Sequence, residues 1–109
     1  MAYNEALAQR IREALDDVSG LSEKKMFGGI AFLVQGNMAC GVTSDNLMVR
    51  ISPESYEAAL AKPFVRVFDM TGRPMKGWIV VEPEGVQSAD DLNQWVKQGV
   101  SFAQSLPAK

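Results

Sequence analysis

The stretch of residues 24–51 constrains the fold more than any other part of the chain. It contains three apolar runs, at residues 26–34, 38–43 and 47–51. Turn-forming residues separate these runs: Gly36-Asn37 is a favoured hairpin loop, and Ser44-Asp45-Asn46 follows the second run. The sequence therefore predicts an antiparallel meander of three strands.

The first run, residues 26–34, has apolar side chains on both of its alternating faces. A strand with this pattern is usually covered on both sides, so we expect it to be central or packed on a partner. Gly28 and Gly29 interrupt the run, and we interpret them as a β-bulge or as a close approach of two backbones. In the third run apolar residues alternate with Met48 and Arg50, so we expect one face of that strand to meet water.

Apolar residues recur at helical spacing near both ends of the chain. They predict an amphipathic helix over about residues 4–18 and another over about residues 89–106, where Ser88 and Asp91 form a capping box. Gly99 lies on the apolar face of the second helix, and we expect it to permit close packing on the sheet. Ser52 followed by Pro53 predicts the start of a shorter helix that ends near residue 62.

Two further runs, at residues 64–70 and 75–82, predict a fourth and a fifth strand. The expected order is therefore α-β-β-β-α-β-β-α, and the hairpins imply antiparallel pairing. We predict an α+β fold, a two-layer sandwich with an antiparallel five-stranded sheet, in a single domain over residues 1–109.

Histidine is absent from the 109 residues, and Cys40 is the only cysteine. The chain thus lacks the commonest general base and metal ligand and cannot form an intrachain disulfide. Cys40 has apolar neighbours, which favours a buried hydrophobe over a reactive thiol. Asp69, Glu82 and Glu84 lie at predicted strand ends, but nothing marks any two of them as an acid/base pair. We therefore expect no enzyme activity, with no catalytic, cofactor-binding or metal-binding residues.

The net charge of −2 gives no overall attraction to nucleic acid or to an anionic membrane. No run approaches the length of a transmembrane helix, and the polar N-terminus does not resemble a signal peptide. We expect a cytoplasmic protein without membrane contact.

A candidate interaction surface comes from basic residues near the predicted strand ends, together with Trp78. If the sheet gathers the basic residues, they would bind a phosphate backbone or an acidic partner; the alternative is that they are solvated charges that discourage edge-to-edge aggregation. Trp78 would stack on a base or belong to the core or an interface. The full candidate set is Lys24, Lys25, Phe27, Gly28, Gly29, Arg50, Arg73, Pro74, Lys76 and Trp78.

Four phrases of the sequence together resemble the TfoX/Sxy N-terminal domain family. They are Glu23-Lys24-Lys25-Met26-Phe27-Gly28-Gly29, Met38-Ala39-Cys40-Gly41-Val42, Leu47-Met48-Val49-Arg50 and Thr71-Gly72-Arg73-Pro74-Met75-Lys76-Gly77-Trp78. The resemblance covers nearly the whole chain. It implies a two-layer fold of α-β(3)-α-β(2)-α order, similar to secretion chaperones. It also implies kinship with bacterial regulators of natural competence, which act with a cyclic-AMP receptor protein to switch on DNA-uptake genes. Those regulators carry a second, C-terminal helical domain, so we expect this chain to be a single-domain member.

We therefore expect a non-enzymatic regulatory or adaptor domain that acts by binding another protein. A homodimer is part of this expectation, because a two-layer domain leaves one sheet face to cover. The alternative is a nucleic-acid-binding module that uses Lys24, Lys25, Arg50, Arg73 and Lys76. The sequence does not decide whether Gly72-Arg73-Pro74-Met75-Lys76-Gly77 is a binding site or a demanding turn.

Overall fold

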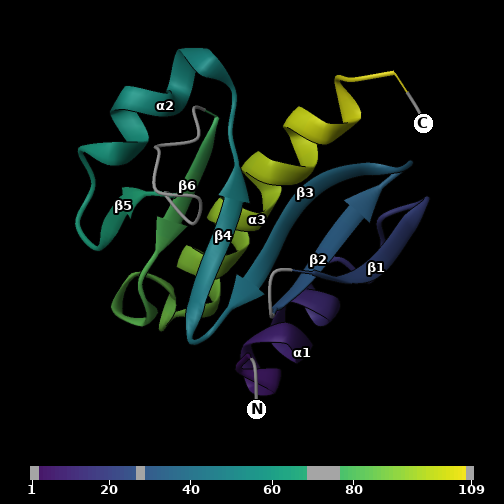
Figure 1. The fold of residues 1–109 in the computed structure, drawn as a ribbon, viewed down its shortest axis with the longest axis horizontal. Helices are drawn as coiled ribbons and strands as arrows, with labels where there is room; N and C mark the ends of the chain where they lie inside the picture. Colours follow the sequence, from purple (N-terminus) through teal and green to yellow (C-terminus); the bar gives the residue numbers. More distant parts are fainter. Residues whose placement is uncertain (1–2, 27–28, 69–76, 108–109) are drawn as a thin grey trace.

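The computed structural model describes residues 3–26, 29–68 and 77–107 of the chain (Figure 1). Within these residues, six antiparallel strands form one sheet in the order β1-β2-β3-β4-β6-β5. The strands are β1 (Leu21–Met26), β2 (Gly29–Val34), β3 (Asn37–Thr43), β4 (Asn46–Arg50), β5 (Val65–Val67) and β6 (Trp78–Val81). The helices are α1 (Glu5–Ala14), α2 (Pro53–Leu60) and α3 (Ala89–Gln104), with a short 3-10 helix, η1 (Pro83–Val86), before α3. The predicted α+β class with an antiparallel sheet is confirmed.

The prediction of five strands is wrong, because the run expected to be one interrupted strand belongs to a hairpin. Lys25 pairs with Ile30, and Met26 pairs with Gly29. β1 forms the edge of the sheet, and residues 22–25 are exposed, so this strand needs no apolar pattern and gave no signal in the sequence. Gly29 marks a close backbone approach: a Cβ at this position would overlap the carbonyl oxygen of Val42 on β3. The register shift of the sheet lies further along β2, at Phe32 and Leu33.

One face of the sheet carries the main core. α3 crosses this face behind β3 and β4, and α1 packs beside α3 (Figure 1). The strand residues on this face are almost fully buried: Ile30, Phe32, Val34, Val42, Leu47, Val49, Ile79 and Val81. Gly99 lets α3 approach closely, since a Cβ there would overlap the carbonyl oxygen of Ala39 on β3. The expected role of Gly99 is confirmed.

The opposite face of the sheet carries a second, smaller apolar cluster. Met48, Phe68 and Val80 are buried there, and the half-buried Trp78 packs against them. The rings of Phe68 and Trp78 meet edge to face, with their centroids 6.0 Å apart. Met48 is only 1% exposed, so the prediction that this side of the third run meets water is wrong for Met48. β4 lies between β3 and β6, which places Met48 in the middle of the sheet.

The helix starts agree with the sequence better than the helix ends do. The Ser88 hydroxyl accepts a hydrogen bond from the backbone N–H of Asp91 (3.0 Å), as expected for the cap of α3. α2 begins at Pro53 after Ser52, whose hydroxyl instead donates to Ser55 Oγ at 3.2 Å. α1 ends at Ala14 instead of continuing to residue 18, because residues 15–18 form a tight turn.

Candidate functional site

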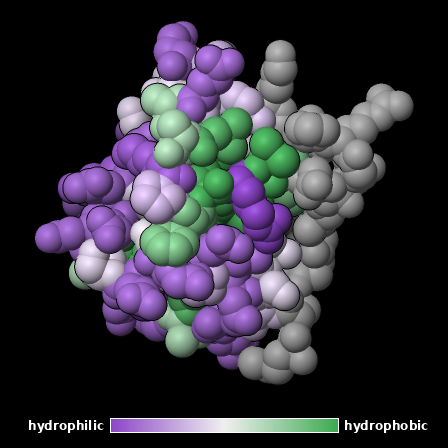
Figure 2. Space-filling model, turned by 90° about the vertical axis from the view of Figure 1, so that its left-hand side faces the viewer, coloured by the Kyte–Doolittle hydropathy of each residue, from purple (hydrophilic) through white to green (hydrophobic). Residues whose placement is uncertain are grey.

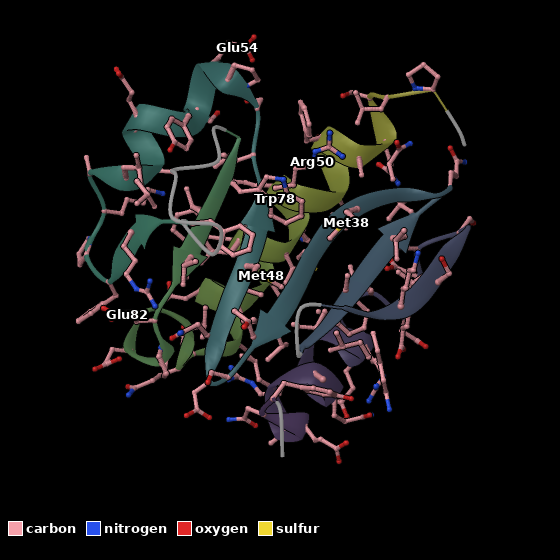
Figure 3. All side chains as sticks on the ribbon, in the orientation of Figure 1. Met38, Met48, Arg50, Glu54, Trp78 and Glu82 are labelled. Atoms are coloured by element: carbon pink, nitrogen blue, oxygen red, sulfur yellow. The ribbon has the colours of Figure 1, made fainter. Side chains whose placement is uncertain are left out.

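Among the described candidate residues, the fold brings Arg50 and Trp78 together from distant parts of the chain. They stand directly opposite each other, at the last position of β4 and the first position of β6. Partners in an antiparallel pair share a face of the sheet, and Figure 3 shows both side chains close together between α2 and α3. The pairing joins segments that α2 and β5 separate along the chain.

A pocket of ≈ 480 Å³ opens beside this pair. Three aromatic rings line it: Trp78, Tyr56 from α2 and Phe102 from α3, all of them partly exposed. Glu54 and Glu57 stand on α2 at its border. A concave, mainly aromatic site with a few charged groups is the usual form of a ligand or peptide pocket.

The guanidinium of Arg50 lies over the Phe102 ring, 5.2 Å from its centroid. This is cation–π geometry, which holds the charged group in one place while leaving its N–H donors available. Among the residues that the structure describes, the ion pairs are Arg12 with Glu23 and Arg66 with Glu82, so Arg50 pairs with no carboxylate there. The Arg50 guanidinium is therefore a positioned cation whose N–H groups are available to donate hydrogen bonds to a ligand.

A second pocket, of ≈ 570 Å³, adjoins the first. The two share Ile51, Pro53, Glu54 and Phe102 as lining residues. The second pocket adds polar residues from both helices: Ser52, Ser55, Lys97, Gln98, Ser101 and Ser105. We call the two adjoining pockets the α2–α3 groove.

The remaining candidate residues lie elsewhere. Lys24 and Lys25 are exposed on the edge strand β1 and point to opposite faces of the sheet. β2 and β3 separate β1 from β4, so about 14 Å of sheet lies between Lys24 and Arg50. Gly29 is buried against β3. Phe27, Gly28, Arg73, Pro74 and Lys76 lie outside the described residues. Among the described candidates, the sheet thus does not gather the basic residues into one patch, and their binding role stays a prediction.

Sequence reasoning missed Tyr56, Phe102 and Lys97 as site residues. Tyr56 and Phe102 fall on the apolar stripes of their helices, which indicated core positions. Both are only partly buried, and they line the pocket beside the last residue of β4 and the first residue of β6. No periodicity in the sequence would have marked this pocket.

The described part of the chain offers no sign of metal or thiol chemistry. It contains no group of three or more possible metal ligands. Complete burial raises the pKa of Cys40 to about 12, so the thiol stays protonated and is a poor nucleophile. The described helices include none that is long and apolar enough to span a membrane.

The other sides of the molecule show smaller features. The side formed by α2 and β5 has a hydrophobic area next to many hydrophilic side chains (Figure 2). Phe64, beside β5, is the exposed large hydrophobic residue of the described chain, at 47%. It adjoins a shallow pocket of ≈ 230 Å³, in which Lys62 lies over the Trp95 ring at 5.0 Å.

Comparison with known proteins places the chain in a family. No curated protein and no solved structure matches it. The model of the TfoX N-terminal domain matches residues 13–103, which include every residue of the α2–α3 groove except Ser105. The match covers most of the 109 residues, so the resemblance seen in the sequence is confirmed: the chain belongs to the TfoX N-terminal domain family.

Proposed function

We propose that this chain is a regulatory domain that acts by binding another protein. The observation that carries the proposal is the α2–α3 groove, in which Arg50 is held over Phe102 without a carboxylate partner among the described residues. Membership of the TfoX N-terminal domain family supports a regulatory role related to competence proteins. The family is not known for enzyme activity, which agrees with the protonated, buried Cys40 and the lack of histidine.

The finer proposal is control of transcription in the cytoplasm, in a pathway related to DNA uptake. A protein of this kind changes gene expression without itself reading DNA, and its net charge of −2 suits a protein partner better than a nucleic acid. The partner would dock on a surface that catalysis does not require, and the groove is such a surface.

Gene deletion with complementation tests this role. Deleting the gene should change a defined set of transcripts, with DNA-uptake genes among them, and expression of the wild-type chain should restore them. A complementing chain with Lys62→Gln, which changes an exposed cation outside the groove, should restore the transcripts as well as the wild-type chain does. An unchanged transcript profile after deletion, under conditions in which the protein is produced, would contradict a regulatory function.

A further inference from the structure

We propose that the α2–α3 groove binds an extended peptide segment of the partner with the pattern basic–apolar–acidic–any–acidic. This inference rests on the proposed function, since it names the partner chemistry that the regulatory surface recognises. It follows from the positions of charged and aromatic side chains along the groove.

The centre of the groove selects an acidic side chain. Arg50 lines the aromatic pocket, and its guanidinium lies over Phe102, whose ring is a wall of both pockets. A guanidinium presents several N–H donors in a planar fork, which matches a carboxylate. A carboxylate bound at this point would give Arg50 the ionic partner that the described residues do not supply.

The first pocket selects an apolar side chain next to that carboxylate. Trp78, Tyr56 and Phe102 present partly exposed rings to it. Insertion of one leucine- or phenylalanine-sized side chain would bury aromatic surface that otherwise meets water. The volume of ≈ 480 Å³ exceeds a single side chain and leaves room for the peptide backbone.

Each pocket of the groove has one charged residue on α2 or α3 that the other pocket lacks, and the two charges have opposite signs. Glu57 lines only the aromatic pocket, whereas Glu54, three residues before it on α2, lines both pockets. Lys97 belongs to the serine-lined pocket and has no carboxylate partner among the described residues. A bound segment therefore places a basic residue beside Glu57 and an acidic residue beside Lys97.

The spacing along α3 sets the spacing of the peptide. Lys97 precedes Phe102 by five positions, which is about 7.5 Å along the helix axis. Two residues of extended peptide span about 6.6 Å. In the proposed segment the second acidic residue therefore stands two positions after the one that meets Arg50, with one residue between them.

NMR titration with a short peptide tests the inference. The probe is the N-acetylated and C-terminally amidated peptide Lys-Leu-Glu-Ser-Asp, added to ¹⁵N-labelled full-length chain. The two tryptophans provide an internal comparison, because Trp78 lines the groove and Trp95 lies in the separate pocket under Lys62. We expect a saturable shift of the Trp78 indole signal and of groove amides, while the Trp95 indole signal stays in place.

Two control peptides separate charge from hydrophobicity. In one, the charges are reversed to give Glu-Leu-Lys-Ser-Lys; in the other, leucine is replaced by serine. Both should bind at least about tenfold more weakly than the probe, since the first reverses all three charged contacts and the second removes the apolar contact.

Variants of the chain assign the contacts. Arg50→Gln should weaken probe binding about tenfold or more, and the more exposed Lys97→Gln about two- to fivefold. Lys62→Gln, the matched control cation, should leave binding within about twofold. The Lys97 and Lys62 variants keep the test decisive if Arg50→Gln disturbs the fold, because both positions are exposed.

Other outcomes overturn the inference. Equal binding of the charge-reversed peptide, or shifts that saturate away from Trp78, would show that the groove does not read this pattern. Trp78 shifts that follow protein concentration without peptide would assign the groove to a second copy of the chain. An equal response to inorganic phosphate alone would indicate a simple anion site. Full restoration of transcripts by the Arg50→Gln chain would overturn the groove assignment while leaving the regulatory function in place.

Discussion

Replacing Gly99 with alanine tests how closely α3 must pack on the sheet. A Cβ at this position would overlap the carbonyl oxygen of Ala39, and it would lie 3.0 Å from the Ala39 carbonyl carbon and 3.4 Å from Val49 Cγ1. The nearest atoms belong to the backbone of β3, which pairs with strands on both sides and cannot move independently. The helix must therefore move away from the sheet.

Two opposing terms set the size of the effect. Alanine gains about 1 kcal/mol over glycine in helix propensity. Overpacking of a tight core costs about 1–3 kcal/mol, and a clash with backbone falls at or above the upper end of that range. We expect a net loss of about 2 kcal/mol in the free energy of unfolding, which corresponds to a fall of roughly 8 °C in Tm for a domain of this size.

Urea unfolding followed by circular dichroism measures this loss, and thermal melts provide a second measurement. The matched control is Ser101→Ala, which lies on the exposed side of the same helix and should gain a few tenths of a kcal/mol from propensity alone. If Gly99→Ala proved as stable as Ser101→Ala, the close contact between α3 and Ala39 would not govern the packing, and the reasoning would be refuted.

Four further predictions follow from individual residues and their burial or contacts. Because burial raises the pKa of Cys40 to about 12, from an ordinary value of 9.0, its thiol should react with Ellman's reagent only after unfolding. The contribution of Cys40 to the free energy of unfolding should be complete below about pH 9 and decline as the pH rises toward 12. In urea titrations, the difference in free energy of unfolding between wild type and Cys40→Ala should therefore shrink between about pH 8 and pH 11. Arg10 donates from Nη2 to the carbonyl oxygen of Val86 at 2.7 Å, so Arg10→Gln should cost about 1–2 kcal/mol in urea unfolding, whereas Arg12→Gln, which breaks the exposed pair with Glu23, should cost at most about 0.5 kcal/mol. Light scattering after size exclusion should find a monomer at micromolar concentrations, because the apolar cluster on the face away from α3 is already buried within one chain; a dimer at those concentrations would support the homodimer expected from the sequence.

Local patterns predicted the elements whose signal lies within a few residues. The hairpin between β2 and β3 follows from two apolar runs around a turn signal, and the start of α3 follows from the Ser88 cap. The predicted loop Gly36-Asn37 is one residue off, because Asn37 pairs with Val34 and the two loop residues are Gln35 and Gly36, both with positive φ. β1 escaped prediction because an exposed edge strand can be polar at residues 22–25. The prediction that Met48 meets water is wrong because the alternation of apolar residues distinguishes the two faces of a strand but does not show what covers each face.

The site was less predictable than the fold because it depends on pairing between distant segments. Arg50 and Trp78 were both candidates, yet only the β4–β6 register places them side by side. A hairpin pattern would equally allow β5 to lie next to β4, which would separate the two side chains. Tyr56 and Phe102 carry apolar-stripe patterns that do not distinguish a core position from a groove wall.

The contact that fixes α3 on the sheet also shapes the groove. Phe102 lies three residues after Gly99, within one helical turn, so any movement of α3 away from Ala39 also moves the ring under Arg50. Gly99→Ala should therefore weaken probe binding under conditions in which the variant remains folded, although its substitution lies outside the groove lining. The small residue at the helix–sheet contact would then serve recognition as well as packing, because the position of the Phe102 ring depends on how closely α3 packs on β3.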